Sequence, residues 1–302
     1  QGSNDKERWI TNNVTEGIAT YDLNMKFVYY HQYNVTLNYK IIGKPSKYPP
    51  LLNYSYFGKI LTAELVLEYT GIWIDSDTVA IISKILQGSN DKERWITLQN
   101  NEIVINESKI FTFEYYHQYY VSIIVEPVEG GYANVESGWY NEGVSLNLVT
   151  YANKDWKFIK WEGIGNGSYT GDLDSIQIKV NDSIVQKAIF YLKVTIKSSQ
   201  GIIVYYSYEG KQYRLEEGNE VTIYLPKGSQ LKLEGYPVSF LYSFDSWSGA
   251  ISNKSNEIYI TLYKPIFIEA KSTYNVVSIL LIISIIIITI VVLLYIFKIR
   301  KK

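Results

Sequence analysis

The chain of 302 residues contains no cysteine and only two histidines. The first absence excludes a disulfide scaffold, thiol catalysis and thiolate metal sites. The second leaves little material for imidazole chemistry. Charge of neither sign is in excess, because 29 Lys and Arg residues face 30 Asp and Glu residues. This balance argues against a nucleic-acid partner, since phosphate binding requires a clear basic excess.

Sequence signatures of catalysis are missing as well. The chain has no glycine-rich phosphate loop, no G-x-S-x-G nucleophile turn and no H-E-x-x-H zinc motif. We therefore expect a protein that is not an enzyme and that uses no cofactor or metal.

Strand signals are abundant, and 29 tyrosines within an aromatic share of 15% favour strands over helices. Apolar and polar residues alternate with the strand period of two in five clear segments, which are 144–149, 175–180, 220–225, 230–235 and 256–262. The stretch 60–69 fits either a helix or a strand, and we assign a strand because its neighbours are strands. The pattern predicts an all-β fold of tandem small modules, with β-sandwich and β-grasp-like arrangements both open.

An internal repeat with an offset of 86 residues organises the chain. Residues 1–11 (QGSNDKERWIT) recur unchanged at 87–97, and FVYYHQY at 27–33 matches FEYYHQY at 113–119. Strand-like starts follow at 34, 120 and 193. We predict a partial β repeat at 1–33, module 1 at 34–119, module 2 at 120–192 and module 3 at 193–274, joined by short linkers. Because the chain starts within a repeat, we expect a missing upstream partner.

A long apolar run marks the C-terminal end. Residues 276–297 contain no charged side chain, and a helix of this length spans a bilayer core. The basic residues after it predict a cytoplasmic tail at 298–302, with residues 1–275 outside the cell; they are Lys298, Arg300, Lys301 and Lys302. This predicts a single-pass cell-membrane protein that contacts the lipid bilayer through one transmembrane helix.

Seven N-x-[ST] sequons in the outer part agree with an external, glycosylated surface. Their asparagines are Asn13, Asn34, Asn53, Asn106, Asn166, Asn181 and Asn253. An exported chain of this kind requires a secretory signal, and none is visible. We therefore expect either that the signal was removed or that the sequence is the C-terminal piece of a longer chain.

The second predicted module resembles the divergent InlB-B-type bacterial repeat module. The matching residues are Gly138, Trp139, Tyr140, Gly143, Phe158, Trp161, Gly163, Ala188 and Phe190. The third module matches less well, since it lacks the G-W-Y element and keeps Gly218, Val221, Phe244, Trp247, Gly249 and Ala270. The ERW block with YYHQY resembles repeats in exported archaeal (Sulfolobales-like) surface proteins and in thermopsin-like proteases with a C-terminal anchor. The resemblance implies a stalk or display role rather than a reaction.

Four groups of residues are candidate binding or catalytic sites. Trp161 and Trp247 suit a carbohydrate platform or, as we favour, a structural aromatic core with Phe158 and Phe244. His31 and His117 lie in identical contexts, and we favour a structural role over a metal pair.

Asp75-Ser-Asp-Thr follows an apolar run but lacks the glycine of an aspartic-protease turn, so we favour a non-catalytic role. The loop 163–174 contains oxygen ligands and glycines without EF-hand spacing, which favours a plain turn over a calcium site.

These features predict a non-catalytic, membrane-anchored stalk, or an S-layer-associated or adhesion protein with surface proteins or surface glycans as partners. The alternative is the C-terminal anchor of an extracellular thermopsin-like protease whose catalytic domain lies upstream. A third interpretation is a glycan-binding adhesin that uses exposed Tyr and Trp side chains.

Overall fold

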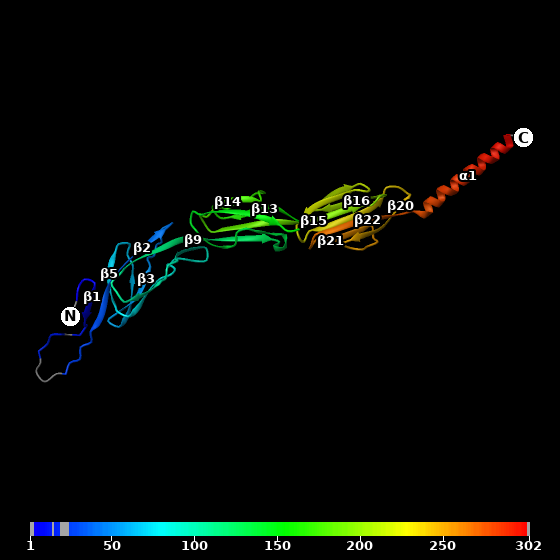
Figure 1. Cartoon of the computed structure of the whole chain (residues 1–302). Coiled ribbons are helices and arrows are strands. Elements are labelled where there is room, and N and C mark those ends of the chain that lie inside the picture. The colour runs from blue at the N-terminus through cyan, green and yellow to red at the C-terminus, as the bar shows by residue number, and fades with distance from the viewer. Residues whose placement is uncertain (1–2, 14, 19–23, 301–302) are drawn as a thin grey trace.

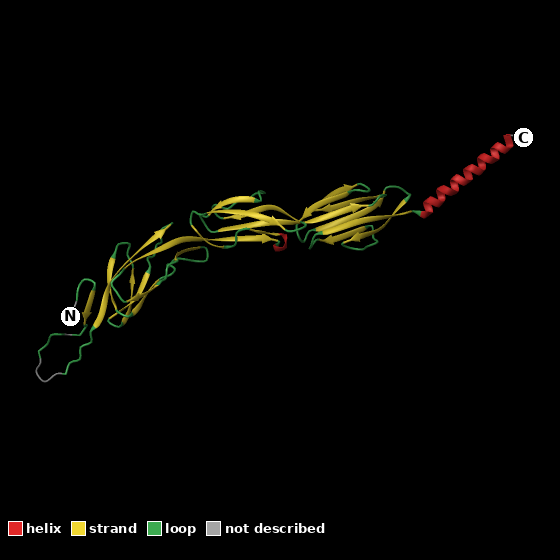
Figure 2. Ribbon diagram, in the orientation of Figure 1, coloured by secondary structure: helices red, strands yellow, loops and turns green. Residues whose placement is uncertain are grey.

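The protein is an elongated row of β structure that ends in one helix, as a computed structural model shows (Figure 1). The structure describes residues 3–13, 15–18 and 24–300. The N-terminus and the C-terminus lie at opposite ends of the row. Strands, turns and one short 3-10 helix make up the described residues before 276, and the long helix lies at the C-terminal end (Figure 2). The predicted fold class, all-β modules followed by one C-terminal helix, is confirmed.

Buried apolar side chains form three separate clusters along the row, which we call the first, second and third cores. The first core draws on residues 35–115, the second on 119–190 and the third on 192–270. Each core lies between part of a long sheet that runs through the row and a small sheet of its own. This arrangement is a two-layer β-sandwich.

In the described residues, the first core and the segment before it contain nine strands. The small sheet has the order β4-β3-β6-β8, and the other strands belong to the long sheet. The bounds are β1 Glu7–Ile10, β2 Tyr30–Ile42, β3 Leu51–Tyr56, β4 Lys59–Glu64, β5 Thr70–Asp75, β6 Thr78–Ile82, β7 Glu93–Thr97, β8 Glu102–Ile105 and β9 Ile110–Glu126. The predicted strand at 60–69 is correct only for its first half, because residues 65–69 lie outside any strand.

The second core uses a three-stranded small sheet of order β10-β12-β14. Its elements are the short 3-10 helix η1 Val128–Gly130, β10 Gly131–Ala133, β11 Gly138–Asn141, β12 Ser145–Ala152, β13 Trp156–Ile164, β14 Ser175–Lys179 and β15 Ile184–Ser198. The third core uses a four-stranded small sheet of order β17-β16-β19-β21. Its strands are β16 Ile202–Tyr208, β17 Lys211–Leu215, β18 Glu220–Leu225, β19 Gln230–Pro237, β20 Tyr242–Gly249, β21 Glu257–Thr261 and β22 Ile266–Tyr274.

Long strands, not linkers, connect neighbouring cores. The start of β9 pairs with β2 through residues 110–116, and its end pairs with β15 through residues 121–126. In the same way, β15 pairs first with β9 and then with β22. The expectation of short linkers is wrong, because the predicted boundaries at 119/120 and 192/193 fall inside continuous strands.

The long strands that connect the cores pair in parallel with one another. The pairs β2–β9, β9–β15 and β15–β22 are all parallel. Each long strand thus closes one core and opens the next, so the long sheet runs through all three cores without a break. The chain enters each core at one end and leaves at the other, which explains the extended shape in Figure 1.

Two equivalent β-bulges explain the F-x-x-W spacing of the sequence. Residues three apart face opposite sides of a regular strand. The pairing of β13 with β15 shifts register between Phe158 and Lys160, and that of β20 with β22 shifts between Phe244 and Ser246. One extra residue at each bulge lets the Phe and the following Trp reach the same core.

The helix α1 spans Val276–Arg300, and none of its described residues is buried. It is long and apolar enough to cross a bilayer. Lys298 and Arg300 lie in its last turn, so the helix extends beyond the predicted end at 297. Lys301 and Lys302 lie outside the described residues.

Candidate functional site

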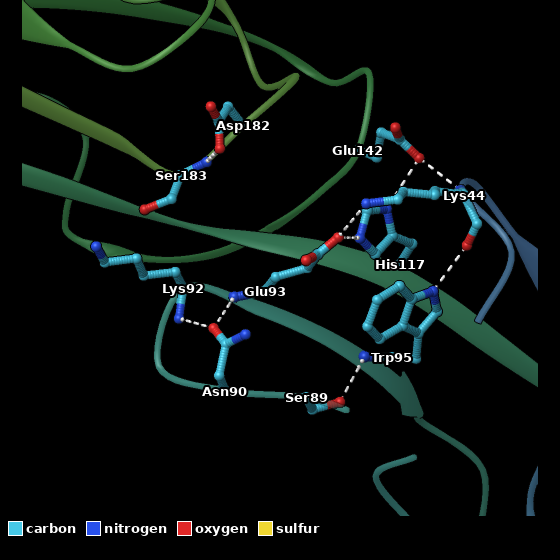
Figure 3. A network of polar contacts seen from close by, with 10 residues as sticks. All are labelled: Lys44, Ser89, Asn90, Lys92, Glu93, Trp95, His117, Glu142, Asp182 and Ser183. Atoms are coloured by element: carbon cyan, nitrogen blue, oxygen red, sulfur yellow. Dashed lines mark hydrogen bonds and ion pairs between the residues drawn. The ribbon is translucent and has the colours of Figure 1, made fainter. Parts of the chain in front are cut away.

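The candidate site is the junction between the first and second cores, with His117 on β9 at its centre (Figure 3). The His117 side chain is fully buried. Its Nε2 lies 2.8 Å from Oε1 of Glu93 on β7, and its Nδ1 lies 2.9 Å from Oε2 of Glu142 after β11. Both ring nitrogens of His117 therefore lie within hydrogen-bonding distance of a carboxylate oxygen. The ring thereby joins a carboxylate of the first core to one of the second.

Lys44 closes the same junction from the turn that follows β2. Its Nζ lies 2.9 Å from Oε1 of Glu93, and its backbone N–H donates to Oε2 of Glu142 at 2.6 Å. The indole N–H of Trp95 donates to the Lys44 carbonyl at 2.7 Å. Trp95 also stacks on His117, with ring centroids 4.7 Å apart. One turn of the first core therefore covers the whole network.

The electrostatics of the junction favour ionised carboxylates. Burial opposes ionisation of Glu93, but hydrogen bonds from Lys44 and His117 outweigh it and lower its pKa. The hydrogen bond from His117 is the main cause of the lowered pKa of Glu142. Charge-assisted hydrogen bonds of this kind are among the stronger ones in proteins. The arrangement is suited to holding two cores in one orientation.

A second layer of the junction is built around Arg94. Its guanidinium lies 4.3 Å from the centroid of the Trp139 ring, and its Nε–H donates to Gln118 at 2.8 Å. The Gln118 amide in turn donates to Asn141 at 2.9 Å. None of these residues was predicted as part of a site. The sequence signals were present, because the repeated ERW block contains Arg94 and the G-W-Y element contains Trp139.

A similar set occurs earlier in the chain, where β1, β2 and β5 meet. Its residues on β1 and β2 precede their counterparts by 86 positions, whereas Trp73 on β5 precedes Trp139 by 66. The His31 Nε2 lies 2.6 Å from Glu7, and Trp9 stacks on His31 at 4.5 Å. Arg8 lies 4.2 Å from the Trp73 ring centroid and donates to Gln32 at 2.9 Å. The two histidines thus lie at equivalent positions on β2 and β9, not together. Sequence reasoning placed them in identical contexts and did not identify their carboxylate contacts.

Asp75 is a buried acceptor in the earlier copy, at the position of Asn141 in the later one. Its carboxylate accepts hydrogen bonds from the side chains of Gln32 and Ser55 and from the backbone N–H groups of Phe57 and Gly58. Burial opposes ionisation, but these four donors outweigh it and lower the pKa of Asp75. The carboxylate therefore fixes the β3–β4 turn onto the long sheet. Asp77 of the same motif is exposed.

The junction between the second and third cores uses a different set of charges. Lys227 lies 2.7 Å from Glu129, and Lys193 lies 3.5 Å from Asp155. These pairs are partly exposed, and each is worth little alone. The continuous strand β15 is the main connection here.

The predicted aromatic residues lie in the second and third cores. Trp161 and Trp247 are fully buried. Phe158 lies 5.8 Å from Trp161, and Phe244 lies 5.4 Å from Trp247, measured between ring centroids. The Trp247 indole donates to the Ser255 carbonyl at 2.9 Å. These positions leave no ring face free for a glycan.

Six of the seven sequon asparagines are exposed, and Asn34 is half-buried. The Asn34 amide donates to the Asp5 carbonyl at 3.0 Å, and its side-chain oxygen is buried. The loop 163–174 forms turns, with Gly165 and Gly167 at positive φ. Within residues 3–13, 15–18 and 24–300, no group of three or more His, Asp or Glu side chains could hold a metal ion.

Comparisons with known proteins give no family for this chain. No family model and no curated protein matches it. Among solved structures it is similar to a Mobiluncus mulieris adhesin with disulfide, isopeptide and ester cross-links, at 9% identity and a TM-score of 0.24, over 46% of this chain and 67% of that one.

Two further solved structures cover more of the chain. One is the Bacillus anthracis TIE protein, at 8% identity and a TM-score of 0.22, over 82% of this chain and 54% of that one. The other is the pilus adhesin SpaC of Lactobacillus rhamnosus GG, at 7% identity and a TM-score of 0.25, over 85% of this chain and 46% of that one. The matched region is about half the length of these two proteins. TM-scores this low carry no argument about function.

Proposed function

We propose that this protein is a non-catalytic stalk at the cell surface, anchored by α1 with the bulk outside and the basic end in the cytoplasm. The observation that supports it best is the continuous long sheet, which runs through three cores and leads directly into an exposed apolar helix. Such a structure separates its two ends and holds one of them at a membrane. Display of another domain, adhesion or attachment of a surface layer would each use this property.

The parallel pairs between long strands suit a stalk that carries tension. In each core, the strand that enters and the strand that leaves lie side by side in the same direction. Tension along the chain therefore shears these two strands, so their hydrogen bonds resist together. The contacts of charged side chains at the junctions support the same role, because His117–Glu142 and Lys227–Glu129 each connect two cores.

The modular division supports the proposal as well. We infer that residues 34–119, 120–192 and 193–274 act as consecutive units of the stalk, with 1–33 as part of a further unit. The exposed sequons fit an external, glycosylated surface. The resemblance to InlB-B-type modules and to archaeal surface repeats points to the same class.

Deletion of α1 tests the anchor. A chain that stops at Asn275 should be soluble, folded by circular dichroism and absent from the membrane pellet, while the full chain should pellet. A full-length control with Ile286→Lys and Ile287→Lys should also be absent from the membrane pellet, because charge at the centre of a membrane span is costly. A folded truncation that still pellets with membranes would refute anchoring by the helix.

A further inference from the structure

The two copies of the junction motif differ in how far they are covered and at two positions, where Asp75 and Ser76 of the earlier copy replace Asn141 and Glu142 of the later one. Trp95 is 7% exposed, whereas its counterpart Trp9 is 51% exposed. The His117 side chain is fully buried, whereas that of His31 is 20% exposed. The stacking, the ion pair with glutamate and the arginine contacts are otherwise equivalent. The earlier copy therefore presents an exposed face, and the equivalent face of the later copy is buried.

The covered copy shows what binds such a face. Lys44 supplies an ammonium group for Glu93 and a carbonyl for the Trp95 indole. Gly43 lies directly against His117, and its φ of +101° brings the backbone close. In the earlier copy, Glu7 and Trp9 present the same carboxylate and indole. Among the described residues, none accepts a hydrogen bond from the Trp9 indole.

The open face continues along the segment before β2. Phe27 and Tyr29 are 37% and 54% exposed, whereas their counterparts Phe113 and Tyr115 are 3% and 0% exposed. Phe113 lies in the parallel pairing with β2, and the Tyr115 hydroxyl donates to the Ser83 carbonyl. Residues 34–86 thus supply the Gly-Lys turn, the parallel strand and the Ser83 carbonyl that cover these side chains in the later copy.

We propose that the face formed by Trp9, Phe27, Tyr29 and His31 binds a half-module of the kind seen at 34–86, joined to the amino-terminal side of Gln1. The bound half-module presents a Gly-Lys turn to Glu7 and Trp9 and a parallel strand to residues 24–30. A second copy of this chain is a poorer occupant, because its own residues 34–86 already cover β7 and β9. The inference is independent of the membrane anchor.

The repeat permits a direct test on the full chain. Residues 1–11 are identical to 87–97, so a copy of residues 34–86 placed directly before Gln1 recreates the natural joint. We would compare this fusion with the unfused chain in detergent by hydrogen–deuterium exchange. Peptides that cover residues 5–10 and 24–30 report the open face, and acrylamide quenching, with a Trp9→Phe variant for subtraction, reports Trp9.

A matched control keeps the length and removes the fit. In this control the added copy carries Leu37→Asp and Leu52→Asp, at positions that are fully buried in the first core. Any protection that comes from mere attachment of extra chain should appear in both fusions. Protection that requires the half-module to fold onto the face should appear only in the intact fusion.

We expect exchange at residues 24–30 to slow by about tenfold or more in the intact fusion only, with Trp9 shielded from quencher. Equal, fast exchange in all three proteins would overturn the proposal. An unfused chain that is already protected and that forms dimers would also overturn it, because a second copy would then occupy the face.

Discussion

The second and third cores each contain a paired Phe and Trp. Trp161 and Trp247 are fully buried beside Phe158 and Phe244, at positions that two equivalent bulges create. We expect Trp161→Ala to lower the free energy of unfolding by about 3–5 kcal/mol, because it leaves a large cavity. Chemical denaturation of the chain that stops at Asn275 measures this change. A loss below about 1 kcal/mol would contradict a core role for the ring.

Acid should loosen the junction at His117 by a predictable route. The pKa values of Glu93 and Glu142 are lowered in the folded protein. Their contribution to stability is therefore present above the unfolded value, about pH 4.3, and is lost as the pH falls through the lower folded values.

The variant Glu142→Gln isolates this effect. It should cost about 1–2 kcal/mol at neutral pH, since it weakens a hydrogen bond between charged groups. It should also reduce the loss of stability on acidification, which thermal unfolding between neutral and acidic pH measures. The variant Glu136→Gln is a control, because Glu136 is exposed and outside the network. An unchanged pH profile in Glu142→Gln would contradict the role of this carboxylate.

Asn34 should differ from the other six sequon asparagines. A glycan is attached to the side-chain nitrogen, and at Asn34 this nitrogen donates to Asp5 while the side chain is half-buried on β2. We expect glycopeptides from the natural protein to carry sugar at exposed sequons and none at Asn34. Mass spectrometry of the purified protein tests this, and a glycan on Asn34 would contradict the contact with Asp5.

At the scale of elements, β9 is the part that makes two cores into one body. We expect a flexible Gly-Ser-Gly-Ser insertion between His117 and Gln118 to uncouple the first and second cores while each stays folded. Small-angle X-ray scattering of the chain that stops at Asn275 should then show a broader distribution of lengths. The same insertion between Glu209 and Gly210, in an exposed hairpin turn, is the control. Identical scattering from both variants would mean that β9 does not stiffen the junction.

Period-two alternation predicted several strands well. The segment 220–225 coincides with β18 of the long sheet. In the small sheets, 175–180 runs one residue past the end of β14, and 256–262 runs one residue past each end of β21. These strands have one buried and one exposed face, so alternation reports them directly. The full length of the long strands β9 and β15 was not predicted. Each strand passes from one core to the next, and the repeat boundary inside it resembles a break between two strands.

The junction could be predicted only in part. The repeated ERW and YYHQY blocks contain Glu93, Trp95 and His117, although the repeat alone does not connect these three residues. Glu142 lies outside the aligned repeat, and Ser76 follows β5 at the equivalent place. A carboxylate that occurs in one copy alone leaves no periodic signal, so only the fold brings it to His117.

The whole molecule has the form expected of the proposed membrane-anchored stalk. The long sheet connects three cores, and α1 extends from the last of them with its apolar surface exposed. Because the chain has no cysteine, single introduced cysteines can carry labels at any chosen position. This makes the orientation and length of the stalk open to direct measurement in cells.

Protease protection tests the proposed surface stalk most directly, on intact cells that produce the full chain with one epitope tag before Gln1 and another after Lys302. We expect added protease to remove the first tag and to leave the second intact until the membrane is permeabilised. Loss of the second tag on intact cells, or protection of the first, would contradict a surface stalk anchored by α1.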